Sequence, residues 1–313
     1  MNLYQKITTG DITALGKGIT LVESTSPKHE KEAQSLLAKC LPKSGNSIRI
    51  GITGVPGVGK STFIETFGKL LTSQGNKVAV LAIDPTSEKT HGSILGDKSR
   101  MNKLSNDNNA FIRPSASSGA LGGIANKTRE TIILCEAAGF DVVLVETVGV
   151  GQNETTVNNL VDFFLLLMLS GAGDELQGIK RGIMEVADAL VITKSDGDNI
   201  QKAKNACLEY KKAIHLFPDM ENGWKPWVNT CSALENTGVS EIFEVIKKFN
   251  QQMTSNKWKI EKRKKQEKYW LHHRIKEELG NKKYKSLVSE GKLEIIEKEI
   301  SQGTSIYQLL NKI

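Results

Sequence analysis

The sequence predicts an α/β fold in which helices cover both faces of a mostly parallel β-sheet. From residue 47 onward, short apolar runs alternate with longer segments of helical spacing, which is typical of parallel strands joined by crossover helices. Most of the short runs are apolar at every position, as strands buried on both faces are. A chain of 313 residues can form one large core of this kind with a smaller appendage.

The elements follow in order along the chain. Helical spacing at 11–24 and 29–41 predicts a helical arm over residues 1–46. The α/β domain is expected over residues 47–250, with strands at 47–53, 77–83, 110–113, 141–146, 162–169, 189–194 and 226–231 and helices at 60–74, 122–138, 154–160, 175–187, 199–214 and 238–250. A charged helical extension is expected over residues 251–313, docked on the core or on a second copy, because such a segment buries little by itself.

Cysteine usage and hydropathy limit the class of protein. Four widely separated cysteines form no C-x-x-C pair, so we expect reduced, mostly buried thiols and neither disulfides nor a zinc site. The first residues lack the pattern of a secretory signal, and the apolar run from Phe163 to Leu169 is too short to span a bilayer. We expect a cytoplasmic protein without a membrane segment.

The net charge of +7 is unevenly distributed, and much of the excess lies between residues 258 and 276. This segment has two interpretations, a surface for nucleic acid or an acidic protein, and a solvated helix face. The second is favoured because Leu271, Ile275 and Leu279 follow helical spacing and can turn inward. A nucleic-acid partner is therefore not expected.

Residues 54–61 read GVPGVGKS and match the phosphate-binding loop pattern G-x-x-x-x-G-K-[ST]. The loop lies between an expected strand and an expected helix, as the motif requires. Its backbone N–H groups can bind phosphate, Lys60 can reach the β- and γ-phosphates, and the Ser61 hydroxyl can ligate Mg²⁺. The expected nucleotide-binding residues here are Gly54, Val55, Pro56, Gly57, Val58, Gly59, Lys60, Ser61 and Thr62.

An acid follows a later strand. Glu146 ends the strand expected at 141–146, three residues before Gly149, which fits a magnesium-proximal acid and a glycine that senses the γ-phosphate. The next residue is Val150, where GTPases that hydrolyse efficiently often place a water-orienting Gln. An apolar side chain cannot orient water, so we expect slow GTP hydrolysis that a partner accelerates.

The loop after the strand at 189–194 resembles the guanine-recognition pattern N-K-x-D. Asp196 can accept both the N1–H and the 2-amino group of guanine, whereas adenine offers no such pair of donors. The stem of Lys194 can lie across the base. Thr193 replaces the usual Asn, which puts one loop-bracing hydrogen bond in doubt. Backbone N–H groups for the guanine O6 are expected from Ser232, Ala233 and Leu234, and the bound nucleotides are expected to be GTP and GDP.

Two further polar loops leave the carboxyl ends of expected strands, where open α/β sheets bind ligands. They contain the carboxylates Asp84 and Asp97 and the cation Lys180. The candidate catalytic residues are thus Lys60, Asp84, Asp97, Glu146 and Lys180, and the candidate Mg²⁺ ligands are Ser61, Asp84, Asp97 and Glu146.

Taken together, these segments resemble the MeaB/ArgK family of P-loop GTPases, chaperones of adenosylcobalamin-dependent methylmalonyl-CoA mutase. The resemblance extends over at least residues 50–234 and rests on five ordered blocks, GVPGVGKST at 54, AIDPTS at 82, ILGDKSRM at 94, ETVGVGQ at 146 and DELQGIKRG at 174. Thr193 is the clearest departure from the family pattern.

The resemblance implies more than the residues do. It makes 47–250 a P-loop GTPase domain and assigns Asp97 to a first switch, Glu146 to a second and 174–180 to a third that communicates with the mutase. It also implies that GTP binding and hydrolysis gate cofactor delivery to the mutase and protect it, and that the C-terminal extension forms a homodimer.

Three alternatives are open. An ArgK-type kinase linked to amino-acid transport would use ATP, and Asp196 argues against it. A nucleic-acid-associated module would bind through the basic segment at 258–276. A metallochaperone GTPase would need a metal-handling cluster, which five histidines and isolated cysteines do not suggest.

Overall fold

The computed structural model describes residues 1–84, 101–116, 121–147, 154–171, 181–301 and 309. The chain divides into two compact units, each built from separate chain segments. Unit 1 comprises Met1–Ser47, Gly119–Phe140 and Ile260–Ile313, and unit 2 comprises Ile48–Ser118 and Asp141–Lys259. The division into an arm, a GTPase domain and an extension at residues 47 and 251 stays a prediction.

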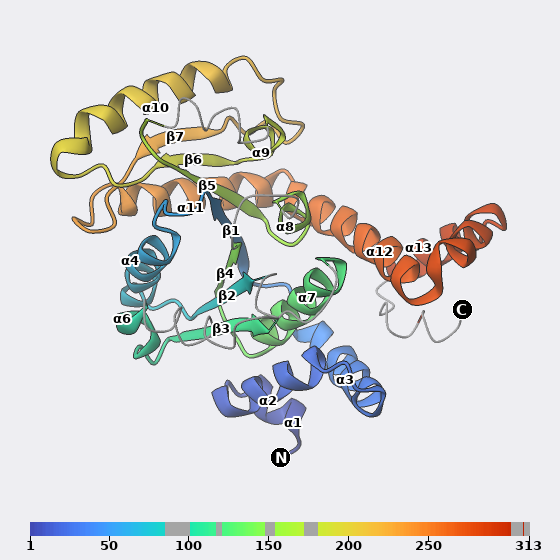
Figure 1. Ribbon diagram of the computed structural model, residues 1–313. Coiled ribbons are helices and arrows are strands. Elements are labelled where there is room, and N and C mark those ends of the chain that lie inside the picture. The colour runs from blue at the N-terminus through green and yellow to red at the C-terminus, as the bar shows by residue number, and fades with distance from the viewer. Residues whose placement is uncertain (85–100, 117–120, 148–153, 172–180, 302–308, 310–313) are drawn as a thin grey trace. The chain divides into compact units, whose positions relative to one another are not determined.

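Unit 2 contains a seven-stranded sheet in the order β3-β2-β4-β1-β5-β6-β7, and every pair is parallel (Figure 1). The strands are β1 (Ile48–Gly54), β2 (Val78–Asp84), β3 (Ala110–Ala116), β4 (Val142–Thr147), β5 (Phe163–Met168), β6 (Ala189–Ile192) and β7 (Trp227–Thr230). All seven strands expected from the sequence are present, and the α/β fold class is confirmed.

The central strands are apolar because both faces of the sheet are covered. Every residue of β4 and of β5 is buried. The register places Ile52 of β1 opposite Glu146 of β4, and Gly54 opposite Leu167 of β5. Since all strands run in the same direction, the loops that follow β1, β4, β5, β6 and β7 leave from one edge of the sheet.

The α-helices in the described part of unit 2 are α4 (Lys60–Ser73), α6 (Asn102–Ser105), α8 (Glu154–Asn158), α9 (Arg181–Glu185), α10 (Ile200–Ile214) and α11 (Val239–Ser255). The expected helix at 175–187 is described only from residue 181. The sequence did not predict α6, because four residues are too few to show a helical period. Helices α4 and α11 pack through Phe67 and Phe243, whose ring centroids are 6.2 Å apart.

Unit 1 is helical in its described residues. It contains α1 (Leu3–Thr8), α2 (Ile12–Glu23), α3 (Pro27–Cys40), α7 (Leu121–Ala137), α12 (Trp258–Ser289, largely in this unit) and α13 (Lys292–Ser301). The expected helices at 11–24 and 29–41 are confirmed, whereas α1 was not predicted. Within α12, Gly280 has φ 77° and ψ 163°, so the helix breaks there. None of the helices in the described part of the chain is long and apolar enough to cross a membrane.

Candidate nucleotide-binding site

The phosphate loop joins β1 to α4, and its glycines allow a backbone that other residues would not adopt. Gly59 occupies the N-cap of α4 at φ 92°, a left-handed conformation that side chains disfavour. A Cβ on Gly54 would lie 2.5 Å from the Leu167 carbonyl oxygen of β5, which is closer than a side chain tolerates. The loop therefore turns tightly against β5 and presents its backbone at the start of α4.

Lys60 is the first residue of α4, and its ammonium group lies over the loop. Its Nζ donates to the carbonyl oxygen of Gly54 at 2.8 Å and lies 3.4 Å from that of Val55. Partial burial lowers the pKa of Lys60, and the nearby Glu146 carboxylate acts in the opposite direction. The structure thus places the predicted phosphate-binding cation next to the predicted magnesium-proximal acid.

Ser61 and Glu146 come from different elements and meet at the same point. The Ser61 hydroxyl donates to Glu146 Oε1 at 3.4 Å, and Glu146 is 4% exposed. One residue further along β4, the Thr147 hydroxyl donates to the Thr53 hydroxyl at 2.8 Å, which ties the ends of β4 and β1 together. A hydroxyl and a buried carboxylate are the oxygen ligands that a hard cation such as Mg²⁺ prefers.

Thr193 makes the loop-bracing hydrogen bond that the sequence left in doubt. Its side chain is buried, and its hydroxyl donates to the Val58 carbonyl oxygen at 2.7 Å. The Met168 carbonyl oxygen is a second, longer contact at 3.2 Å, and one hydroxyl proton can serve only one acceptor well. The shorter distance indicates that the hydroxyl donates to Val58, so Thr193 braces the phosphate loop.

Asp196 is held by the loop that follows β7. The Ser232 hydroxyl donates to Asp196 Oδ2 at 2.5 Å and accepts the backbone N–H of Glu235 at 3.1 Å. The Ser195 N–H donates to the Cys231 carbonyl oxygen at 3.0 Å, which connects the same two loops through their backbones. These contacts fix the carboxylate that the sequence assigned to guanine.

Other residues of these two loops lie close to the phosphate loop and to α4. Lys194 has φ 55°, and its Cε lies 3.9 Å from the point where a Cβ on Gly59 would be. The Ala233 carbonyl oxygen accepts the Thr66 hydroxyl of α4 at 3.0 Å, and Leu234 is 79% exposed. The described candidates therefore gather at the carboxyl edge of the sheet.

Some candidates cannot be placed. Asp97, Gly149, Val150 and Lys180 lie outside the described residues. Asp84 is the last residue of β2, where its backbone is paired with Ala116 of β3, and its side chain is not described. Their predicted roles stay predictions.

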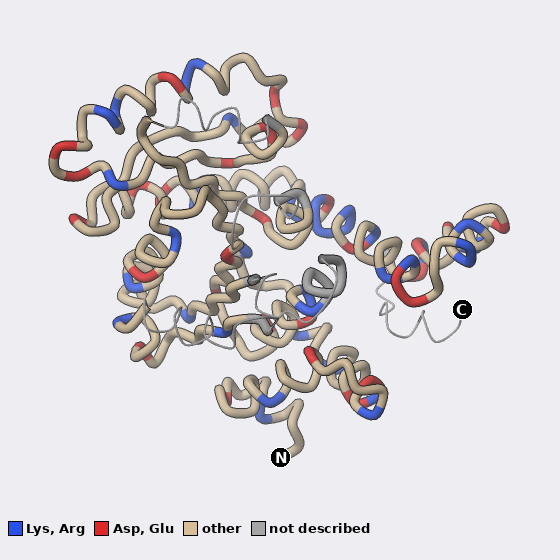
Figure 2. The backbone as a smooth tube through the Cα atoms, viewed as in Figure 1, with Lys and Arg blue, Asp and Glu red and all other residues tan. Residues whose placement is uncertain are grey.

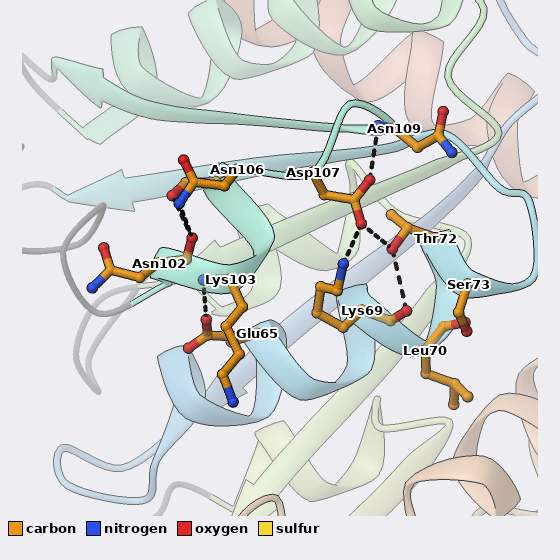
Figure 3. A network of polar contacts seen from close by, with 11 residues as sticks. Glu65, Lys69, Leu70, Thr72, Ser73, Asn102, Lys103, Asn106, Asp107 and Asn109 are labelled. Atoms are coloured by element: carbon orange, nitrogen blue, oxygen red, sulfur yellow. Dashed lines mark hydrogen bonds and ion pairs between the residues drawn. The ribbon is translucent and has the colours of Figure 1, made fainter.

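A polar network that the sequence did not reveal connects α4 to the segment around α6 (Figure 3). Asp107 accepts Lys69 Nζ at 2.5 Å, the Thr72 hydroxyl at 2.7 Å and the Asn109 N–H at 2.9 Å. The hydrogen bonds from Lys69, from the Asn109 backbone and from Thr72 lower the pKa of Asp107 to about 2. An Asp in a polar stretch such as this one is a turn signal that the sequence shows, because its side chain can accept the N–H two residues later. The sequence does not show its partners on α4, because they lie far away along the chain.

The basic segment of α12 is engaged within unit 1. Arg263 donates to the carbonyl oxygens of Gly45 and Ser47, and Lys268 pairs with Glu297 at 2.8 Å. Arg274 contacts the buried Glu130 and also Glu278. These partners favour the structural interpretation of the segment over nucleic-acid binding. Among the described residues there is also no cluster of three His, Cys, Asp or Glu side chains that could hold a metal ion.

A parallel sheet with a phosphate loop after its central strand and a Thr-Lys-Ser-Asp loop two strands away is the arrangement of a P-loop GTPase. The chain belongs to the MeaB family: the family model described as methylmalonyl-CoA mutase-associated GTPase matches residues 15–287.

Named relatives agree with this assignment. The chain is 54% identical over 245 residues to a probable GTPase of Mycobacterium tuberculosis, covering 78% of this chain and 73% of the relative. It is 49% identical to the GTPase ArgK of Escherichia coli, covering 88% and 84% of the two chains. The mouse methylmalonic aciduria type A homolog, a mitochondrial protein, is 46% identical, with 88% and 69% covered.

A solved structure supports the fold. It is described as the LAO/AO transport system kinase, has 41% sequence identity and a TM-score of 0.77, and the match covers 89% of this chain and 84% of that one. This protein is therefore a GTPase of the MeaB family.

Proposed function

We propose that this GTPase is a chaperone of an adenosylcobalamin-dependent acyl-CoA mutase, methylmalonyl-CoA mutase or a related enzyme, and that it gates cofactor loading and protects the mutase. The observation that carries this proposal is the family match over residues 15–287, because that family is described by its association with the mutase. The relatives named for methylmalonic aciduria lend further support.

The phosphates of GTP would lie on the backbone N–H groups of the phosphate loop at the N-terminus of α4. Lys60, now bonded to the Gly54 carbonyl oxygen, would turn toward the β- and γ-phosphates. Ser61 and Glu146, which already lie side by side, would hold Mg²⁺, and Asp84 and Asp97 are further candidates. Bound there, Mg²⁺ would offset the negative charge that develops on the phosphate oxygens.

The guanine base would be recognised by the loop after β6 and the loop after β7, which the hydrogen bond from Ser232 to Asp196 connects. Asp196 would accept the guanine N1–H and 2-amino group, and the hydroxyl of Ser232 keeps that carboxylate in place. Lys194 lies beside Gly59 and would cover the base with its aliphatic stem. Adenine would leave the carboxylate without donors, at a cost of about 1–3 kcal/mol or more.

The remaining candidates would couple the nucleotide to the partner. Gly149 would sense the γ-phosphate, and Lys180 would stabilise charge or relay the nucleotide state. The mutase would prefer one nucleotide state of the GTPase, and the two affinities must then depend on each other by the same factor. A coupling free energy of about 1–3 kcal/mol is enough for such a switch. A homodimer and a cytoplasmic location belong to the same proposal.

The alternative is an ATP-dependent kinase linked to amino-acid transport. The observation in its favour is the description of the 41% identical solved structure as a transport system kinase. The carboxylate of Asp196, fixed by Ser232, argues for GTP, since adenine has neither the N1–H nor the 2-amino group that guanine donates to it.

The test is turnover of GTP and of ATP by the full chain, alone and with the methylmalonyl-CoA mutase of the same organism. Lys60→Ala provides the blank. Slow, GTP-selective hydrolysis that rises when mutase is added would support the chaperone. ATP preference with phosphate transfer to a protein would establish the kinase, and GTP turnover that is indifferent to the mutase would refute the proposed partner.

A further inference from the structure

A second candidate binding site lies at the opposite edge of the sheet from the nucleotide site. A cavity of about 350 Å³ opens before the first residues of β7, between α9, the end of α10 and the segment that joins α10 to β7. In Figure 1 the three elements lie together within unit 2. The nucleotide-site loops follow the carboxyl ends of the strands, whereas this cavity is at their amino ends, so it is separate from GTP binding.

The cavity is lined by aromatic and by charged side chains, and one of its aromatic rings is held in place by neighbouring residues. Phe217, Trp224 and Trp227 line it, and all three are half-buried. The carboxylates of Glu185 and Asp219 line it as well. The indole N–H of Trp224 donates to the Asp188 carbonyl oxygen at 2.9 Å, and its ring packs edge-on against Phe249 with centroids 5.1 Å apart. An aromatic ring that is held in place before a ligand arrives, as that of Trp224 is, is typical of the central anchor pockets of binding sites.

The rim of the cavity continues into a basic stripe on α10. Lys204, Leu208, Lys211 and His215 follow one another at intervals of three or four residues, so they share one face of the helix. All four are exposed, and Leu208 is 58% exposed. Lys211 and His215 also line the cavity, so the stripe runs directly into it. Figure 2 shows the lysines along α10 in blue.

This combination identifies the chemistry of the occupant. An exposed Leu among cations, leading to an aromatic cavity, complements a peptide that carries acidic residues and one apolar side chain. The acidic residues would lie along the stripe, because Glu185 and Asp219 would repel a carboxylate inside the cavity, and the apolar side chain would enter the cavity. We propose that α10 and this cavity bind an acidic peptide segment of a partner protein, anchored by one apolar residue.

The test is a display selection of random 12-residue peptides on the GDP-bound full chain, followed by titration of the selected synthetic peptides. The selected peptides are expected to be acidic with an apolar anchor and to shift the emission of Trp224 and Trp227. The double variant Lys204→Glu/Lys211→Glu is expected to weaken their binding by about tenfold or more, because like charges repel.

Lys202→Glu is the matched control. Lys202 is an exposed lysine of α10 about 160° around the helix from Lys204 by the 3.6-residue period, so its replacement is expected to leave peptide binding unchanged. GDP affinity and helical content of each variant verify that it has folded.

Three results would overturn the proposal. The first is that no peptide is enriched, or that enriched peptides bind wild type and the double variant equally. The second is that an oligouridylate displaces the peptides, which would make the stripe a polyanion site. The third is that the double variant changes the oligomeric state in sedimentation, which would assign the surface to a second copy of this chain.

Discussion

At the scale of single residues, the most informative side chain is Thr193, which stands where the guanine-recognition loop usually has Asn. The hydroxyl reaches the Val58 carbonyl oxygen at 2.7 Å, so a smaller side chain makes the same kind of contact to the phosphate loop. The sequence alone showed that Thr replaces Asn, but it could not show whether the hydroxyl reaches the phosphate loop. That depends on the distance between two loops that lie far apart in the chain.

Thr193→Val tests this bond. Valine has nearly the same shape but no hydroxyl, so the Val58 carbonyl oxygen would lose its buried donor. We expect GDP and GTP to bind about tenfold more weakly, in line with about 1–3 kcal/mol for a buried polar group left unpaired. Fluorescent-nucleotide titration measures the affinity, and Thr193→Ser, which keeps the hydroxyl, is the control. Wild-type affinity in the Val variant would contradict the assigned role.

Asp196→Asn tests base selection. An amide offers one acceptor and one donor, so it cannot accept both guanine donors but can pair with xanthine, which has an oxygen in place of the 2-amino group. We expect GTP affinity to fall by about 2 kcal/mol or more and xanthosine triphosphate to bind better than in wild type. Competition titration of the two nucleotides gives the answer, and an unchanged preference for GTP would exclude Asp196 as the base-reading residue.

At the scale of elements, sequence reasoning found the parts whose pattern is local. Strands β4 and β5 were visible because every side chain in them is apolar and buried. Helices α1 and α6 were not visible, because six and four residues show no reliable period. The predicted clustering of Lys60, Ser61 and Glu146 followed from the rule that parallel strands end at one edge, whereas the anchoring of α6 on α4 needed coordinates.

The anchoring of α6 can be tested through pH. The pKa of Asp107 is depressed to about 2 in the folded protein, from an ordinary value of 3.8, so its stabilisation is present above pH 4 and is lost as pH falls toward 2. Asp107→Asn should lower the free energy of unfolding by about 1 kcal/mol at pH 7 and by less at pH 2. Urea unfolding at both pH values measures this, with Ser105→Ala as the control. An equal loss at both pH values would show that the carboxylate charge is not what matters.

At the scale of the whole molecule, the ends of the chain belong to one unit. The N-terminal helices, α7 and most of α12 share unit 1, although long stretches of sequence separate them. Arg274 of α12 contacts Glu130 of α7, whose side chain is 3% exposed, and Lys127 lies 3.6 Å from the same carboxylate. The sequence suggested a solvated basic tail, and it could not show which cations would find buried partners.

Arg274→Ala tests this contact. Removing the guanidinium deprives the buried Glu130 of one cation while Lys127 stays near it, so we expect the free energy of unfolding to fall by about 2 kcal/mol. Thermal unfolding followed by circular dichroism measures the loss. Lys282→Ala, an exposed lysine of the same helix, is expected to change stability by less than about 0.5 kcal/mol. Equal stability of the two variants would show that the buried pair contributes nothing.

The composition of unit 1 also has a consequence during translation. Residues 1–47 are synthesised before α7 and α12, and Arg263 of α12, which donates to the Gly45 and Ser47 carbonyl oxygens, follows roughly 200 residues later. At about 5–20 residues per second, the gap lasts roughly 10–40 s. Helices α1 to α3 can pack with α7 during this time, whereas the Gly45 and Ser47 carbonyl oxygens must wait for Arg263. The contacts that α12 makes within unit 1 are therefore among the last to form as this stretch of chain is synthesised.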